Sequence, residues 1–294
     1  MIILENENLI ASFRTKGAEL QSLKNKKKNQ EYIWDAKPEF WAKHSPVLFP
    51  IVGALKNNQY SYQGQTYELS RHGFARDQVF EVEPVNAAEV VFTLRDSVES
   101  RQNYPFSFSL SLRYTLSEQG LTCSYEVQNP AESDLLFSIG GHPAFATPVN
   151  GKKYNDYSLT FNADTELEYH KISDNLISDE TVVISLESQQ LQLKHELFYN
   201  DALVFKSLKS NQITLSNAID QSGLEFSFHG FPYFGIWAAK DADFICLEPW
   251  CGIADGVNHS QQLEDKEGII RLGSKEFWQR SWTVKIILPQ ATNG

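Results

Sequence analysis

Short strand-like runs occur along most of this chain, each separated from the next by a polar or glycine-containing turn. In SFSLSLRYTL (107–116), apolar and polar residues alternate with period two, as expected of a strand with one buried face. The stretch QYSYQGQTYELS (59–70) predicts a hairpin around Gly64. Helical patterns are few, and PEFWAKH (38–44) is the main candidate for a turn or two of helix. Many short strands at roughly even spacing predict an all-β sandwich or barrel.

The size and composition of the chain fit a globular protein. Its 294 residues, 41% of them hydrophobic, can bury one large core or two small ones. No stretch has the composition of a linker, so we predict a single domain spanning residues 1–294. Cys123, Cys246 and Cys251 are odd in number and lack CxxC spacing, which argues against a disulfide framework and a structural zinc site. We expect them to behave as small buried hydrophobic residues.

The charge of the chain restricts its partners. A formal net charge of -11 argues against broad binding to nucleic acid or to an anionic membrane surface, because both need basic faces. The N-terminus lacks a signal-peptide pattern, and no run reaches the ~18 apolar residues of a membrane helix. We therefore expect a cytoplasmic protein whose partner is a small molecule. No pattern in the sequence predicts an oligomeric state.

Two segments place a titratable side chain in an unusual setting. In FSIGGHPAF (137–145), His142 follows a glycine pair that permits close backbone approach, and Pro143 restricts it to extended conformations. In FICLEPWCG (244–252), Glu248 lies among apolar residues, where loss of hydration raises the pKa of a carboxyl group and suits it to act as a general base. A histidine satisfied inside the core and a glutamate paired with an arginine are the alternative interpretations.

Cationic side chains gather in a third segment, SRHGFAR (70–76). Arg71, His72 and Arg76 follow a predicted strand, where they can donate hydrogen bonds to hydroxyl, carboxylate or phosphate groups. Surface ion pairing by two arginines in an acidic protein is the alternative.

An aromatic residue and a second acid complete the candidates. Trp250 projects to the same face as Glu248 if the strand continues past Pro249, and an aromatic ring beside a carboxylate is typical of a sugar site. Asp201, in NDALVF (200–205), is by itself only a turn aspartate.

Together these motifs carry a family resemblance. SRHGFAR, GGHPAF, NDALVF and LEPWCGIADG, in this order, resemble the aldose 1-epimerase (galactose mutarotase-like) superfamily, most closely its LacX-type branch. The resemblance extends from GAELQSL at Gly17 to the closing FWQRSWTVKIIL. It implies a large antiparallel β-sandwich, or supersandwich, of about twenty strands, with an open cleft for a hexose and no cofactor or metal.

The resemblance also assigns roles to the candidate residues. It implies that His142 is the general acid at the ring oxygen and Glu248 the general base at the anomeric hydroxyl. Because one proton must leave O1 while another reaches the ring oxygen, we expect the two groups on opposite edges of the sugar. Arg71 and His72 fall where the family binds sugar hydroxyls, and Asp201 matches its substrate-binding aspartate.

Other functions remain open at this stage. The HGFAR motif is shared with the hexose-6-phosphate branch, so Arg76 is either a phosphate ligand or part of a structural ion pair. A sugar sensor on the same fold would keep Trp250, Arg71 and His72 without needing both proton-transfer residues. A glycoside hydrolase or lyase would need a second carboxylate ~5–9.5 Å from Glu248, with Asp201 and Asp255 as candidates.

Overall fold

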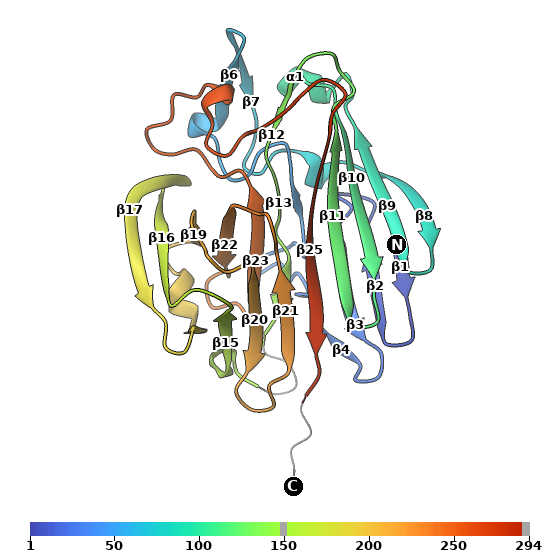
Figure 1. The fold of residues 1–294 in the computed structure, drawn as a ribbon, viewed down its shortest axis with the longest axis vertical. Helices are drawn as coiled ribbons and strands as arrows, with labels where there is room; N and C mark the ends of the chain where they lie inside the picture. Colours follow the sequence, from blue (N-terminus) through green and yellow to red (C-terminus); the bar gives the residue numbers. More distant parts are fainter. Residues whose placement is uncertain (148–151, 290–294) are drawn as a thin grey trace.

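The computed structural model describes residues 1–147 and 152–289, which form twenty-five short strands and very little helix (Figure 1). Every pairing between these strands is antiparallel, from the β1–β2 pair of Ile2–Glu5 with Leu9–Phe13 onwards. The predicted all-β, antiparallel architecture is therefore confirmed. Residues 148–151 and 290–294 of the predicted domain lie outside the described residues.

A nine-stranded sheet forms one layer. Strands such as β10 (Ser109–Leu116) and β20 (Gln212–Asn217) alternate in burial, as the period-two pattern predicts. In spatial order they are β18 (Gln190–Gln192), β15 (Tyr157–Phe161), β20 (Gln212–Asn217), β21 (Gly223–Ser227), β25 (Phe277–Ile287), β11 (Gly120–Gln128), β10 (Ser109–Leu116), β9 (Glu89–Arg95) and β8 (Glu81–Asn86).

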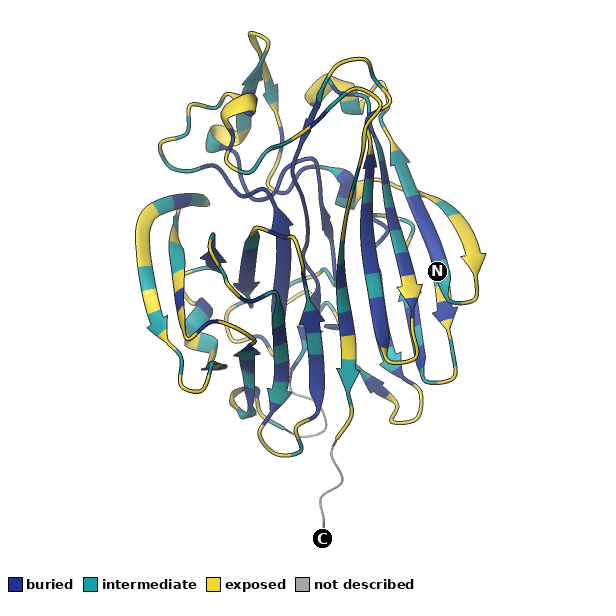
Figure 2. Cartoon of the chain, viewed as in Figure 1, coloured by how far each residue is buried: buried dark blue, intermediate teal, exposed yellow. Residues whose placement is uncertain are grey.

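An eight-stranded sheet forms the second layer and carries the candidate site. In spatial order its strands are β17 (Leu176–Ser185), β16 (Glu166–Ser173), β19 (Leu203–Phe205), β22 (Tyr233–Trp237), β23 (Phe244–Cys251), β13 (Ile139–Gly141) and β5 (Val47–Leu48), while β14 (Ala144–Ala146) also pairs with β23. All eight residues of β23 are buried, because both of its faces are covered (Figure 2).

Smaller elements complete the chain. The β6–β7 pair (Gln59–Tyr62 and Gln65–Glu68) is the hairpin predicted around Gly64. Strands β3 (Leu20–Asn25) and β4 (Gln30–Glu31) extend the β1–β2 sheet, and β12 (Leu135–Phe137) pairs with β24 (Ile270–Leu272). The helical elements are α1 (Ser100–Asn103) and the 3-10 turns η1 (Lys56–Asn58), η2 (Ala75–Asp77), η3 (Tyr154–Asp156), η4 (His195–Phe198) and η5 (Leu263–Asp265). The helix expected within 38–44 is absent: residues 38–40 form a turn, and the backbone then runs without regular structure.

Aromatic side chains join the two large sheets. Phe226 of β21 lies 5.7 Å from Phe145 of β14 and 6.3 Å from Phe234 of β22, measured between ring centroids. Pairs at such separations contribute about 0.5–1.5 kcal/mol beyond the area that they bury. All three cysteines are buried and unpaired, as expected from their number and spacing.

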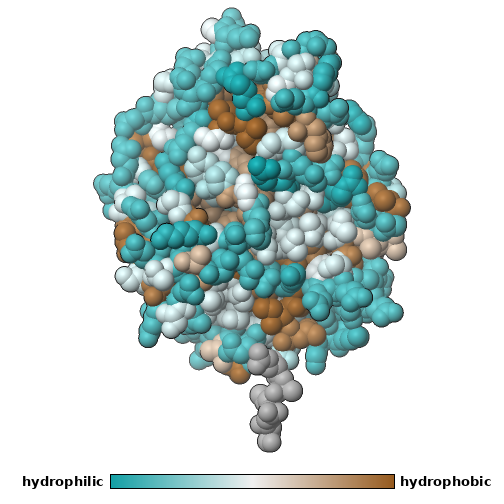
Figure 3. Space-filling view, in the orientation of Figure 1, coloured by the Kyte–Doolittle hydropathy of each residue, from teal (hydrophilic) through white to brown (hydrophobic). Residues whose placement is uncertain are grey.

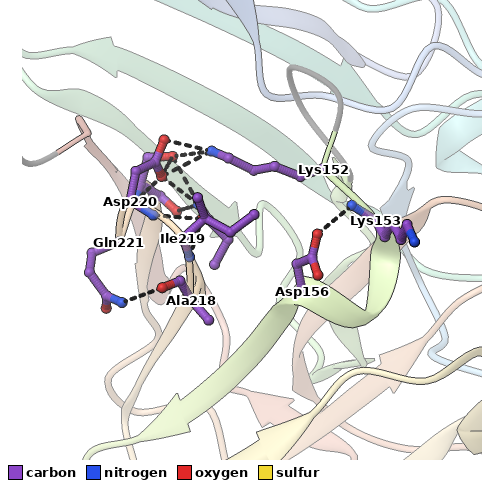
Figure 4. Close-up of polar contacts among 9 residues, drawn as sticks. Lys152, Lys153, Asp156, Ala218, Ile219, Asp220 and Gln221 are labelled. Carbon is purple, nitrogen blue, oxygen red and sulfur yellow. Dashed lines mark hydrogen bonds and ion pairs between the residues drawn. The ribbon is translucent and has the colours of Figure 1, made fainter. Parts of the chain in front are cut away.

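Polar residues dominate one face of the molecule. The face in Figure 3 is mostly hydrophilic, with hydrophobic residues in separate small groups. At one edge, Lys152 donates to both carboxylate oxygens of Asp220 at 2.9 and 2.8 Å, tying the β20–β21 turn to the segment before η3 (Figure 4). Within 1–147 and 152–289, no helix has the length and apolar character needed to cross a membrane.

Candidate active site

Seven of the eight candidate residues from the sequence, all except Asp255, line one cleft of about 460 Å³ on the eight-stranded sheet. They are His142, Glu248, Arg71, His72, Arg76, Asp201 and Trp250. The cleft is completed by residues that the sequence did not indicate, namely Trp41, Gly53, Ile172, Asn175, Ile177, Ala202, Val204, Trp237 and Ala254. Segments from across the chain therefore meet at a single hollow.

Strand register explains why His142 and Glu248 meet. Gly140 of β13 pairs with Trp250, and Ala144 of β14 pairs with Cys246. Continuing either register by two residues puts His142 opposite Glu248, in the gap between β13 and β14. The distance from His142 Nε2 to Glu248 Oε2 is 3.3 Å, and both side chains are buried.

This distance corrects one expectation. The two groups were expected on opposite edges of a sugar, but no sugar fits between atoms 3.3 Å apart. The chemistry does not require that separation, because the ring oxygen and the anomeric oxygen are both bonded to C1. Two adjacent groups can therefore serve the two oxygens from the same edge of the ring.

Glycines make room for Trp250 on the cleft face. A Cβ on Gly140 would lie 2.6 Å from Trp250 Cδ1, and one on Gly235 would lie 2.5 Å from the far side of the same indole. The Trp250 ring therefore covers the backbone of both neighbouring strands. The close approach expected at the GGH segment is present, and Gly141 shows it on the opposite face, where a Cβ would lie 2.4 Å from the hydroxyl of Tyr125.

Two further tryptophans surround His142. Trp41 stacks on the imidazole with ring centroids 4.7 Å apart, and Trp237 meets it edge-on at 5.6 Å. Trp237 was detectable in the sequence, since alternation along YFGIW puts it on the same face as Gly235. Trp41 lies in the segment expected to be helical, and no pattern in its neighbourhood links it to the site.

Hydrogen bonds define how His72 faces the cleft. The backbone N–H of Gly53 donates to His72 Nδ1 at 3.1 Å, and Arg71 Nε lies 3.2 Å from His72 Nε2. A neutral imidazole accepts at only one nitrogen. Arg71 Nε–H also points at Nε2, so the two contacts cannot both be hydrogen bonds to a neutral ring. The backbone amide cannot rotate away, which favours the tautomer in which Nδ1 accepts and Nε2 carries the proton. In this tautomer the ring does not accept a hydrogen bond from Arg71 Nε, which lies 3.2 Å from Nε2.

The remaining polar residues form the rim. Arg71 Nη1 donates to Asn175 Oδ1 at 3.0 Å, and Arg76 Nη2 donates to the carbonyl of Arg71 at 2.7 Å. Asp201 has a φ of 106°, a conformation that costs a non-glycine residue about 1–3 kcal/mol and often occurs at functional sites. Its Oδ1 accepts from the N–H of Ala202 at 2.7 Å.

Comparison with known proteins agrees with this geometry. A sequence profile of the aldose 1-epimerase family matches residues 1–268. The chain belongs to the aldose 1-epimerase family. It is 35% identical over 302 aligned residues to the chromosomal protein LacX of Lactococcus lactis subsp. lactis, covering 97% of this chain and 99% of that protein.

Solved structures extend the similarity to the fold. A galactose mutarotase related enzyme from Lactobacillus acidophilus superposes with a TM-score of 0.93 at 31% identity, covering 99% of this chain and 98% of that chain. A galactose mutarotase-like protein from Lactobacillus casei gives a TM-score of 0.89 at 30% identity, covering 98% and 100% respectively. The predicted superfamily and LacX-type branch, and the galactose mutarotase-like fold, are therefore confirmed.

Burial dominates the electrostatics of the site in this member of the aldose 1-epimerase family. Desolvation raises the pKa of Glu248 well above its ordinary value; Arg71 opposes this shift, and Asp201 adds to it. Desolvation also lowers the pKa of His142 to about 3. The pKa of His72 is well below its ordinary value because of burial, with His142 and Arg71 adding to the effect.

The depressed pKa of His72 predicts a loss of stability in acid. Above pH 6.5 the imidazole is neutral in both the folded and the unfolded chain. Below pH 6.5 the unfolded chain binds a proton at His72, whereas the folded chain does not. The free energy of unfolding of wild type should therefore fall with pH below 6.5. In His72→Asn, a residue that tolerates the φ of 68° found here, this fall should be shallower by up to about 1.4 kcal/mol per pH unit.

Urea unfolding at several pH values between 6.5 and 5 measures this difference. His229→Asn, at an exposed position, controls for the loss of a histidine. Parallel pH dependences for wild type and His72→Asn would show that folding does not hinder protonation of His72.

The described residues include one cluster with the composition of a metal site. Ligand atoms of His142, Cys246 and Glu248 lie within 4.8 Å of one another. A histidine that binds metal almost always donates its other ring N–H to a partner. Nδ1 of His142 is buried and has no hydrogen-bond partner among the described residues, so the cluster does not fit a resident metal by this criterion. That catalysis needs no metal stays a prediction.

Proposed function

We propose that this protein is an aldose 1-epimerase that interconverts the α and β anomers of a hexose, with His142 and Glu248 as the proton-transfer groups. The observation that carries the proposal is the 3.3 Å approach of these two buried side chains inside a cleft of about 460 Å³. Pairs of titratable groups with strongly shifted pKa values in a cleft are typical of active sites.

The reaction assigns a task to each group. Glu248 takes the proton from O1 while His142 gives a proton to the ring oxygen, so that the C1–O5 bond breaks and an open-chain aldehyde forms. Rotation about C1–C2 presents the other face of the aldehyde. The ring hydroxyl then attacks C1, and the two proton transfers run in reverse. No atom is gained or lost overall, and each proton-transfer group is worth about 10²–10⁴ in rate.

The state of the pair determines whether this reaction can begin. Desolvation raises the pKa of Glu248 and lowers the pKa of His142, so burial favours the form of the pair with its proton on Glu248 over the form with its proton on His142. The proposed reaction needs the same proton on His142. Transfer of this proton from Glu248 Oε2 to His142 Nε2, which lie 3.3 Å apart, converts the first form into the second. The positive charge of Arg71 favours the second form, because it stabilises the carboxylate of Glu248.

The lining of the cleft suits a pyranose ring. Trp250 offers an apolar face for sugar C–H groups, and its ring lies over Gly235 beside Glu248. Arg71 and His72 lie side by side in the lining and can donate to sugar hydroxyls, and Asp201 supplies an acceptor at the rim. We assign these residues, with Arg76, to substrate binding.

A hexose 6-phosphate is the second candidate substrate, and Arg76 favours it. Nε of Arg76 is buried with no hydrogen-bond partner in the described chain, and Asp77 Oδ2 is 3.8 Å from it. Two neighbouring arginines could hold a phosphate of nearly two negative charges. We favour the neutral sugar, because Arg76 is already bonded to the carbonyl of Arg71, and Arg71 to Asn175.

Polarimetry or NMR exchange on freshly dissolved α-glucose, α-galactose and their 6-phosphates tests both candidates. We expect mutarotation of the free hexoses well above the uncatalysed rate, and a ratio of kcat/KM for glucose 6-phosphate over glucose below about ten. A larger ratio that falls as salt rises would make Arg76 a phosphate ligand. Binding of sugar with no acceleration for any of the four would instead indicate a sugar sensor.

Glycoside hydrolysis is less well supported. Of the two carboxylates considered as partners for Glu248, Asp255 is fully buried, and its Oδ1 accepts from Lys266 Nζ at 2.7 Å. Asp201 lines the cleft and remains the only one of the two that can reach a substrate. Release of free sugar from an aryl glycoside would support this alternative.

A further inference from the structure

Asp255 lies seven residues after Glu248, and its side chain is wholly buried. Oδ1 accepts from Lys266 Nζ at 2.7 Å, and Oδ2 accepts from the backbone N–H of Lys56 at 2.9 Å. His259 Nδ1 lies 3.2 Å from Oδ2. Replacing a buried ion pair by apolar residues is often neutral or stabilising, so stability alone does not account for this arrangement.

The backbone of Asp255 joins two other segments. Its N–H donates to the carbonyl of Ala54 at 2.9 Å, and its carbonyl accepts from the N–H of Ile177 at the same distance. Gly53, Ile177 and Ala254 are immediate neighbours of these contacts, and all three line the cleft. Asp255 thus ties together three segments that form one wall of the site, although it does not line the cleft itself.

The contact with the segment around Gly53 reaches His72. The Gly53 N–H points at His72 Nδ1, which favours the tautomer with the proton on Nε2. Gly53 packs closely on the residue before Asp255, since a Cβ on Gly53 would lie 2.4 Å from the Cβ of Ala254. Asp255 holds the other end of the segment through the N–H of Lys56.

From these contacts we infer that Asp255 is a positioning residue, which holds the segment 53–56 so that the Gly53 amide keeps His72 in the tautomer that donates to the sugar. The inference rests on the proposed function for its kinetic consequence, while the tautomer itself can be observed without turnover. An ion pair that merely stabilises the fold would leave the tautomer of His72 unchanged when the Lys56 contact is removed.

Lys56 provides a matched pair of variants. Lys56→Pro removes the N–H that Asp255 accepts and leaves the Asp255–Lys266 ion pair in place. The site is compatible with proline, because Leu55 is extended at φ -92° and ψ 149°, and position 56 is the first of η1. Lys56→Ala removes the same side chain but keeps the N–H, and therefore controls for the loss of the lysine contact with His259.

Two measurements test the inference. In Lys56→Pro we expect the KM for the hexose to rise about tenfold with kcat within about threefold, while Lys56→Ala stays near wild type. Imidazole ¹⁵N NMR should show His72 protonated at Nε2 in wild type and Lys56→Ala, and a mixture of tautomers in Lys56→Pro. An unchanged tautomer and KM in folded Lys56→Pro would overturn the inference.

A second pair of variants tests the inference if Lys56→Pro does not fold. The double variants D255N/K266M and D255L/K266M both remove the ion pair and leave no buried charge without a partner. Only the asparagine of D255N/K266M keeps an acceptor for the Lys56 N–H. We expect the altered tautomer and raised KM in D255L/K266M alone; equal behaviour of the two would overturn the inference. If wild type turns over no sugar, the proposed function fails, and the NMR comparison still decides the role of Asp255.

Discussion

Glu248→Gln is expected to lower kcat/KM for the hexose by about 10²–10⁴-fold while the protein stays folded. Glutamine keeps the shape of the side chain and a hydrogen-bond acceptor for His142, but it cannot take the proton from O1. It also cannot exchange a proton with His142 across the 3.3 Å that separates the two side chains. Mutarotation of α-glucose followed by polarimetry gives the rate, and the melting temperature verifies the fold.

His142→Asn should cause a loss of similar size, because it removes the acid at the ring oxygen. The two groups share one proton, so the double variant should be little worse than either single variant. Wild-type rates in Glu248→Gln would show that another residue, or water, supplies the base. Losses that multiply in the double variant would show that the two groups act independently.

The strands were predictable from the sequence because their signal is local. Alternation in 107–116 identified β10, and Gly64 located the β6–β7 turn. Pairing was not predictable in this way, since β23 pairs with β22 on one side and with β13 and β14, about a hundred residues earlier, on the other. The contact of His142 with Glu248 depends on that long-range register, so the motifs named both residues without giving their distance.

The errors at the site have physical causes. Trp41 follows a turn in a segment without periodic pattern, and only tertiary packing places it on the imidazole of His142. Asn175 comes into the cleft at the β16–β17 turn, where its φ of 66° suits asparagine, but nothing local links that turn to Arg71. The expected separation of acid and base was wrong because it assumed opposite edges of the ring for two oxygens bonded to one carbon.

Arg71 is placed to affect both sugar binding and proton transfer at Glu248. Its Nε lies beside His72 Nε2, its Nη1 bonds Asn175, and its charge opposes the effect of burial on the pKa of Glu248. The sequence suggested a role in sugar binding alone. The geometry adds a second role, because the proposed reaction needs Glu248 as a carboxylate and the Arg71 charge favours that form.

Arg71→Ala is therefore expected to raise the KM for the hexose and to lower kcat, with a combined loss in kcat/KM of about 10²-fold. Arg71→Lys keeps a positive charge but loses the planar fork, so it should recover most of kcat while KM stays high. Asn175→Ala removes the partner of Arg71 Nη1 without touching the charge, and it should change KM by only a few-fold. Initial rates at saturating and limiting sugar separate kcat from KM.

Wild-type kcat in Arg71→Ala would show that the carboxylate of Glu248 forms without this charge. Arg71 would then act in sugar binding alone.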